Sequence, residues 1–471
     1  MVEEKIPFKT KLAYGALGAG ISLPSQITFS AITFFYNVVL GLSEQLIGIA
    51  WLLFSFWNAV NDPIFGFIED NTKSKKYGRR IPYIRFGAPI YGIVFIFCWL
   101  PFADLNNEIA LFVNLIVVLF VFDTIFTILG LINYTLPAEM ALTVKARGNL
   151  LLYSNLITSI SLLLSYILPI ILLIGNESPN APFIFLIVMI FVGIICAAIL
   201  FISSYYLKEN EYTQIEPTLP IVKAIKETFK NTPFLIFEVS NFSFTIAQTI
   251  LTTAIYYYIP FVLKLTGFLT FLPLALVFLM IFIFIFVFNF IIRKIGVKFT
   301  FIIALLWTSF SFLLTFFIGW TLEFALIGFI LIGSGISGFM LSNQAVVADI
   351  VDYDEIRTTK RRETTYSGIN ALITKPAISL ANWLFLVIIP LFGYDPDKTV
   401  QGFMAQLGIM IGFSLIPFIF LLIGALVIVM FFYPLNGPDW LTHKEKLIKI
   451  HRSKEEEYIN FLKKNRSDRT K

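Results

Sequence analysis

The chain has 471 residues, of which 58% are hydrophobic and only 14% are charged. A soluble domain carries roughly a quarter charged residues, so this composition excludes an ordinary water-soluble fold and predicts that most of the chain lies in lipid. The formal net charge of +5 is small, and both histidines, His443 and His451, lie in the polar tail, which excludes a His-based metal site or catalytic triad within the membrane.

The N-terminal sequence MVEEKIPFKTK runs directly into a long apolar segment, without the pattern of a cleaved signal peptide, so we expect a cytoplasmic start. A helix needs about 20 mostly apolar residues to cross a bilayer, because lipid offers no partner to exposed backbone groups. Segments of this length predict twelve spans, at residues 12–40, 44–69, 82–102, 108–138, 147–174, 181–207, 233–264, 268–292, 297–319, 323–349, 364–392 and 402–434.

The distribution of Lys and Arg predicts the orientation, since positively charged short loops stay on the cytoplasmic side. With the N-terminus inside, the outer loops hold only Lys264 and Lys398 of the 35 basic residues. Both termini are therefore expected in the cytoplasm, in a multi-pass protein of the cell membrane.

The longest polar stretch between spans follows the sixth helix and divides the chain into two sets of six. Such a pair of halves predicts the all-α major facilitator fold, with a substrate site between the halves near the midplane. We expect a six-helix bundle at 1–207, a cytoplasmic loop at 208–232, a second six-helix bundle at 233–434 and a charged cytoplasmic tail at 435–471.

Four charged residues fall within predicted spans and away from the span ends, where each costs about 2.5 to 3.5 kcal/mol and marks a functional candidate. They are Asp62, Asp123, Glu238 and Lys375. Glu238 lies near the cytoplasmic end of its helix, and for this residue we favour a side chain that reaches water. For Asp62, Asp123 and Lys375 the alternative to a functional role is a structural one, in which they only hold neighbouring helices together.

Helical spacing indicates which of these groups converge. Asn58 and Asp62 are four residues apart and share a face that presents two oxygen-bearing groups, as a hard cation requires. On the fourth helix, one stripe carries Asp123, Thr127, Gly130 and Tyr134. We predict that Asp62 is the coupling carboxylate for Na⁺ or H⁺, and that Lys375 is its counter-charge or a substrate ligand; the alternative is a purely structural pair.

Two segments dense in both charge signs, after helix two and after helix ten, are candidates for cytoplasmic gating pairs that differ between states. The alternative is solvated surface charge. The residues concerned are Asp70, Arg79, Arg80, Asp349, Asp352, Arg361, Arg362 and Glu363.

Four stretches resemble the glycoside–pentoside–hexuronide:cation symporter family of the major facilitator superfamily. They are KLAYGALGAG, NDPIFGFIEDNTKSKKYGRRIPYI, LPAEMALTVKARGNL and ADIVDYDEIRTTKRRETTYSGINALITKPA, and they spread over nearly the whole chain. The resemblance implies that Asp62 and Thr127 belong to a cation site, that Lys375 lies near the cation and sugar sites, and that Tyr134 stacks on a sugar ring.

The departures from the family pattern are equally informative. The second cation-site aspartate of the family is Asn58 here, its two sugar-binding aspartates are Ser22 and Gly130, and a supporting arginine is Asn155. The loss of a carboxylate favours H⁺ coupling or a weaker cation site, and galactoside specificity should not be inherited; Asp123 is a partial substitute. The expected substrate-binding positions are Lys375, Tyr134, Ser22, Gln26, Gly130, Asn155, Asn370 and Asn382.

The function expected from the sequence is cation-coupled symport of a sugar, glycoside or related small solute. Its alternatives are a lysophospholipid or other amphiphile symporter, since the chain has 52 Phe residues and the family resembles lysophospholipid carriers, and an uncoupled facilitator. A sensor or scaffold would need only the fold, whereas an enzyme would need a nucleophile and base or a metal cluster, which the sequence does not suggest. We expect no cofactor beyond the coupling ion, no nucleic-acid partner, membrane lipids as surroundings and a functional monomer.

Overall fold

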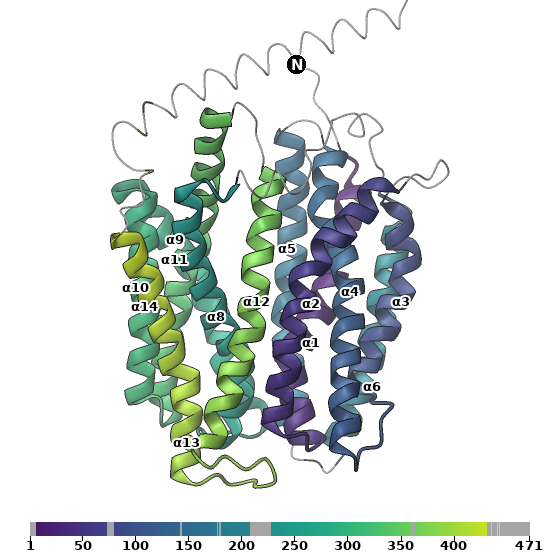
Figure 1. Cartoon of the computed structure of the whole chain (residues 1–471), viewed down its shortest axis with the longest axis vertical. Coiled ribbons are helices and arrows are strands. Elements are labelled where there is room, and N and C mark those ends of the chain that lie inside the picture. The colour runs from purple at the N-terminus through teal and green to yellow at the C-terminus, as the bar shows by residue number, and fades with distance from the viewer. Residues whose placement is uncertain are drawn as a thin grey trace, which may run out of the picture.

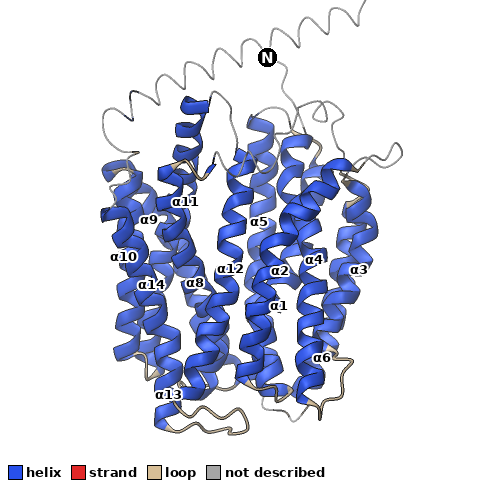
Figure 2. Ribbon diagram, in the orientation of Figure 1, coloured by secondary structure: helices blue, strands red, loops and turns tan. Residues whose placement is uncertain are grey.

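The computed structural model describes residues 6–72, 80–141, 144–176, 178, 180–207, 228–358, 363–430, 435, 440 and 442. Within these residues the chain is helical, with no strand, and short loops join the helices (Figure 2). This agrees with the all-α fold predicted from the apolar segments.

The helices form two groups that follow each other in the sequence and lie side by side (Figure 1). The first group comprises α1 (Phe8–Phe34) with the π-helical turn η1 (Phe35–Val39), α2 (Glu44–Asn71), α3 (Ile81–Trp99), α4 (Glu108–Met140), α5 (Val144–Pro169) with η2 (Ile170–Ile174), and α6 (Ala181–Ser203). The second comprises α8 (Thr232–Phe261), the short helix η4 (Gly267–Phe271), α9 (Leu272–Ile295), α10 (Val297–Ile318), α11 (Leu322–Thr358), α12 (Glu363–Leu391), and a last span made of α13 (Phe403–Met410), η5 (Ile411–Leu415) and α14 (Ile416–Met430).

Each described span corresponds to one of the twelve predicted segments. Among the described residues, ten helices are long and apolar enough to cross a membrane. Helices α1 and α2 are not among the ten, although they have 27 and 28 residues. Both contact the opposite half of the molecule, α1 against α8 and α2 against α12. Their polar residues are therefore available to the interface between the halves.

Helix α11 extends well beyond its predicted end at residue 349, so the acidic segment expected to be a loop is helical up to Thr358. Charged residues do not oppose a helix once it has left the lipid. The last turn is stabilised by Arg357, whose guanidinium Nη2 lies 3.3 Å from Asp354 Oδ1 three residues earlier. Its positive charge also complements the helix dipole at this end.

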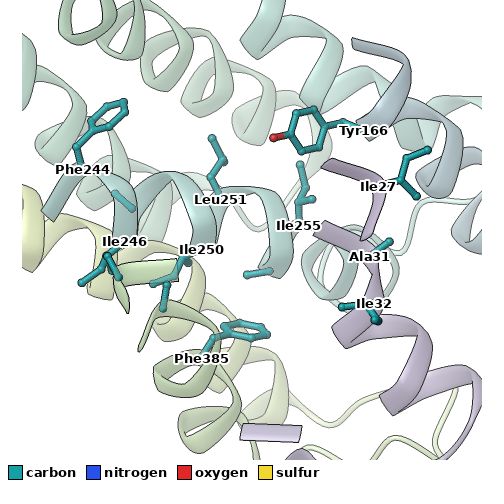
Figure 3. Close-up of a cluster of buried hydrophobic side chains, with 14 of the residues drawn as sticks. Ile27, Ala31, Ile32, Tyr166, Phe244, Ile246, Ile250, Leu251, Ile255 and Phe385 are labelled. Atoms are coloured by element: carbon teal, nitrogen blue, oxygen red, sulfur yellow. The ribbon is translucent and has the colours of Figure 1, made fainter. Parts of the chain in front are cut away.

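Small residues allow close helix packing within each half. A Cβ atom on Gly92 of α3 would lie 2.7 Å from the carbonyl oxygen of Gly193 on α6, so only glycine permits this backbone approach. Between the halves the packing is by larger apolar groups. Figure 3 shows part of this core, with Ile27 and Ala31 of α1 on one side and Leu251 and Ile255 of α8 on the other.

Polar side chains also join the halves near the C-terminal end of α1 and in η1. The hydroxyls of Tyr257 and Tyr394 each donate to Asn37 Oδ1, at 3.2 and 3.3 Å. Asn37 Nδ2 in turn donates to Glu44 Oε1 at 2.9 Å. Earlier in the chain, within α1, the hydroxyl of Ser30 lies 3.4 Å from that of Tyr256.

Candidate functional site

The side chains that meet between the halves come from α2, α4 and α12. Asp62 extends from α2, Thr127 from α4 and Lys375 from α12. Because α2 packs along α12 and also against α4, residues on the shared faces of these three helices lie close together.

The ammonium group of Lys375 lies among three oxygen atoms of the first half. It donates to Asp62 Oδ1, to Thr127 Oγ1 at 3.2 Å and to Asn61 Oδ1 at 3.5 Å. The side chains of Lys375 and Asp62 are 17% and 13% exposed, so the pair is largely removed from solvent. The acid of the second span and the amine of the eleventh therefore meet, as the sequence predicted, although their roles in coupling stay predictions.

Asn61 was missed by the sequence reasoning, yet it connects the other polar residues of the site. Its Nδ2 donates to Asp123 Oδ2 and to Thr127 Oγ1, the latter at 3.1 Å. Its side chain is fully buried, as is nearly all of Asp123. Asn61 follows Asn58 by three residues, and this spacing puts both amides on the same face of the helix. The prediction used only the spacing of four residues from Asn58 to Asp62.

Asn58 is buried one turn away on α2, and its Oδ1 has no hydrogen-bond partner among the described residues. A buried carbonyl oxygen without a donor is costly, and it is also a ready ligand for a cation. The structure thus places, one helical turn from Asp62, an amide oxygen that accepts no hydrogen bond from the described part of the chain.

Two more polar residues of α12 belong to the predicted substrate-binding residues. Asn382 is buried and its Oδ1 accepts a hydrogen bond from Thr33 Oγ1 of α1 at 3.3 Å, while Thr33 itself accepts from Trp51 Nε1 at 2.9 Å. Asn382 therefore contacts the opposite half. Asn370 instead lies within its own half, against Asn241 of α8.

The remaining predicted substrate-binding residues lie on α1, α4 and α5. Gln26 accepts a hydrogen bond from the Tyr166 hydroxyl at 2.8 Å, and Ser22 is half-buried one turn earlier on α1. Tyr134 is 56% exposed, Asn155 is exposed, and no atom lies within 4 Å of a Cβ built on Gly130. The hydrogen bond of Gln26 joins α1 to α5 and does not involve Asp62 or Lys375.

The predicted gating residues are only partly described. Arg79, Arg361 and Arg362 lie outside the described residues, as do the side chains of Asp70 and Glu363. Arg80 and Asp349 are buried and Asp352 is half-buried. Burial argues against solvated surface charge for the first two, while a role in gating stays a prediction.

The expectation that Glu238 reaches water was wrong, because only 3% of its surface is exposed. Helix α8 is covered at this point by residues of α11 and α12, including Val347, Ile350 and Tyr366, which line a small cavity beside the carboxyl group. The periodicity of α8 alone could not predict that these helices cover Glu238.

Comparisons with known proteins identify the family and the fold. The profile of the family described as "MFS/sugar transport protein" matches residues 11–437. A candidate glycoside/cation symporter of Escherichia coli K12, YagG, is 22% identical over 97% of this chain and 98% of its own length. An uncharacterized symporter of Synechocystis sp. is 31% identical over 151 residues, which are 31% of this chain and 28% of that protein.

Solved structures with the same fold were also found. The crystal structure of a D-xylose-proton symporter superposes with a TM-score of 0.65, at 15% identity, over 88% of this chain and 97% of that one. At this identity the likeness concerns the fold alone.

Proposed function

The chain belongs to the MFS/sugar transport protein family, and from this premise we propose that it is a cation-coupled symporter that moves a sugar, glycoside or related small solute by alternating access. A profile match from residue 11 to residue 437 covers both halves. Membership of a transporter family, rather than any feature missing from the chain, supports a non-enzymatic role.

One observation carries the proposal of coupling, namely that the Lys375 ammonium of the second half is held by Asp62 and Thr127 of the first. The two halves separate and rejoin in alternating access. A charge pair that spans them therefore has different partners in different states, which is what allows a bound cation to bias the equilibrium between states.

We propose H⁺ as the coupling ion. A proton that binds Asp62 neutralises the carboxylate and releases Lys375 without requiring space for a further ion. A Na⁺ ion would need several oxygen ligands, whereas Asp62 is engaged by Lys375, Asp123 by Asn61, and position 58 is an amide. Na⁺ coupling is the alternative that experiment must separate, since Asn58 Oδ1 offers one unused oxygen.

The proposed solute follows from the family and from the polar groups in the predicted set. Amide and hydroxyl groups such as those of Gln26, Asn155 and Ser22 suit the hydroxyls of a sugar, and the exposed ring of Tyr134 provides an apolar surface for one of its faces. The YagG relative, a candidate glycoside/cation symporter, points to the same class of solute.

Uptake into proteoliposomes tests the proposal. The purified protein is reconstituted and supplied with labelled sugars, glycosides, uronates and lysolipids under an inward H⁺ gradient, an inward Na⁺ gradient or neither. We expect accumulation of a sugar-type solute with the H⁺ gradient. We expect Asp62→Asn to lose accumulation but retain exchange, while Glu323→Gln, an exposed carboxylate in the first turn of α11, behaves as the unmodified protein. Accumulation that survives in Asp62→Asn would refute the coupling role, and uptake of lysolipid alone would refute the solute class.

A further inference from the structure

A second buried carboxyl group lies in the other half of the molecule and takes no part in the Asp62–Lys375 contacts. Glu238 on α8 is 3% exposed and adjoins a cavity of about 30 Å³. The cavity is further lined by Phe234, Phe237, Val347, Ile350, Tyr366 and Asn370.

The size of this cavity limits what it can hold. A single water molecule requires roughly 10–15 Å³ of cavity volume. The cavity therefore has room for one or two waters and not for a sugar ring. Apart from Glu238, Tyr366 and Asn370 the lining is apolar, so it offers few of the oxygen ligands that a metal cation needs. A proton or a proton-carrying water is the ligand that fits without rearrangement.

The hydrogen bonds around Glu238 can be satisfied whether the carboxyl group is ionised or protonated. One terminal atom of the Asn370 carboxamide lies 3.0 Å from Glu238 Oε1 and 3.2 Å from Oε2, and 2.5 Å from the Asn241 carboxamide. With nitrogen at this position, Asn370 donates to an ionised Glu238. With oxygen at this position, it accepts from a protonated Glu238 and from Asn241 Nδ2. Rotation of two amides thus converts one arrangement into the other.

The charged surroundings of Glu238 are sparse. No Lys or Arg among the described residues forms an ion pair with it. On α12 the other titratable group of the cavity is the Tyr366 hydroxyl, which accepts from Asn231 Nδ2 at 2.7 Å. Helix α14 packs on α8 at Ser240 and has no charged residue, and α10 contacts the neighbouring Phe237 through Phe301.

Charged residues of the covering helices lie close in sequence to the positions that line the cavity. Helix α11 lines the cavity with Val347 and Ile350, and Asp349 lies between them in the sequence. Its other acids are Asp352, Asp354 and Glu355, which follow, and Glu323 in its first turn. Helix α10 has Lys298 near its start, one turn before Phe301. Asp354 is paired with Arg357. A carboxylate at this depth without a cationic partner raises the free energy of the folded protein. Binding of a proton removes that charge.

We propose that Glu238, Asn241 and Asn370 form a proton-binding site in the second half of the molecule, separate from the Asp62–Lys375 pair. Asn370 lies five residues before Lys375 on α12. A proton that reorients the Asn370 amide therefore acts on the same helix that carries Lys375, the residue that contacts Asp62 in the other half. The site itself stands on the contacts around Glu238, and its influence on transport rests on the proposed function.

Infrared difference spectroscopy of the full-length protein in lipid tests the site directly. Spectra are recorded from acidic to alkaline pH for the unmodified protein and for Glu238→Gln, Asp62→Asn and the exposed control Glu323→Gln. We expect a carboxyl C=O band that disappears as pH rises, that persists in Asp62→Asn and Glu323→Gln, and that is missing in Glu238→Gln. The same set of bands in Glu238→Gln as in the unmodified protein would overturn the proposal.

Asn370→Leu supplies a second test on a chain that keeps Glu238. Loss of the amide removes the donor to the ionised form, so the band should persist to more alkaline pH than in the unmodified protein. An unchanged titration would show that Asn370 is not a partner of the proton. If the band behaves as expected but no solute accumulates under an ion gradient, the proton site stands and the proposed transport function fails; accumulation without a Glu238 band gives the opposite result.

Discussion

The ion pair between the halves allows a quantitative test through Lys375→Met and Asp62→Asn. Each single change leaves one charge without its partner, because Lys375 Nζ and Asp62 Oδ1 are in contact and their side chains are only 17% and 13% exposed. Breaking a buried pair costs about 3–5 kcal/mol. The residual exposure lets water reach the remaining charge, so we expect about 2–4 kcal/mol of destabilisation for each single variant.

The double variant removes both charges and leaves neither one buried alone. Its loss of stability should be smaller than the sum of the single losses by about 2 kcal/mol, a coupling energy typical of residues in direct contact. The assay is denaturant unfolding of the four proteins in the same detergent. Losses that add to within about 0.5 kcal/mol would refute the pairing on which the coupling proposal depends.

The exposed pair formed by Lys398 and Asp395 is a matched control. Its Nζ and Oδ2 atoms are 2.9 Å apart, but the side chains are 64% and 37% exposed. Water screens such pairs and they contribute little. The corresponding cycle, Lys398→Met with Asp395→Asn, should show much weaker coupling, and equal coupling in the two cycles would mean that burial is not the cause.

Three further variants test other contacts. Asn61→Ala removes the amide donor to Asp123 and should destabilise the protein by about 1.5–3 kcal/mol in the same unfolding assay, as for hydrogen bonds to charged groups; no change would mean that Asp123 has another donor. Asn58→Asp replaces an amide whose oxygen has no hydrogen-bond partner among the described residues with a carboxylate, so Na⁺ should stimulate uptake more strongly. If Na⁺ stimulates the variant no more than the unmodified protein, position 58 does not belong to the cation site. Gly92→Ala places a Cβ 2.7 Å from the Gly193 carbonyl and should cost about 1–3 kcal/mol of stability, and an unaffected unfolding curve would contradict the packing of α3 on α6.

The fold followed from the sequence because a bilayer imposes a strict length and composition on every crossing. Helix ends outside the lipid lack that constraint, and this explains why α11 continues to Thr358 where a loop was expected. The pairing of Asp62 with Lys375 was also predicted, because an isolated charge at that depth would be costly and Lys375 was the one basic residue expected deep inside a span.

Other parts of the site could not be derived from spacing along a single helix. Asn61 meets Asp123 only because α2 and α4 cross at one particular rotation about their axes. The same limitation applies to Glu238, whose burial depends on α11 and α12 and not on its own position in α8. The periodicity of one helix identifies a face, whereas the neighbour of that face is set by packing across the bundle.

The hydrogen bonds around the C-terminal end of α1 set a scale for the conformational equilibrium of the molecule. Four of them cross between the halves, from Ser30, Thr33 and twice from Asn37. At about 1 kcal/mol each, their loss would keep a form opened at this end near one molecule in a thousand, other contributions being equal. A solute and its ion would then have to bind the opened form about a thousand times more tightly than the closed one to populate the two equally.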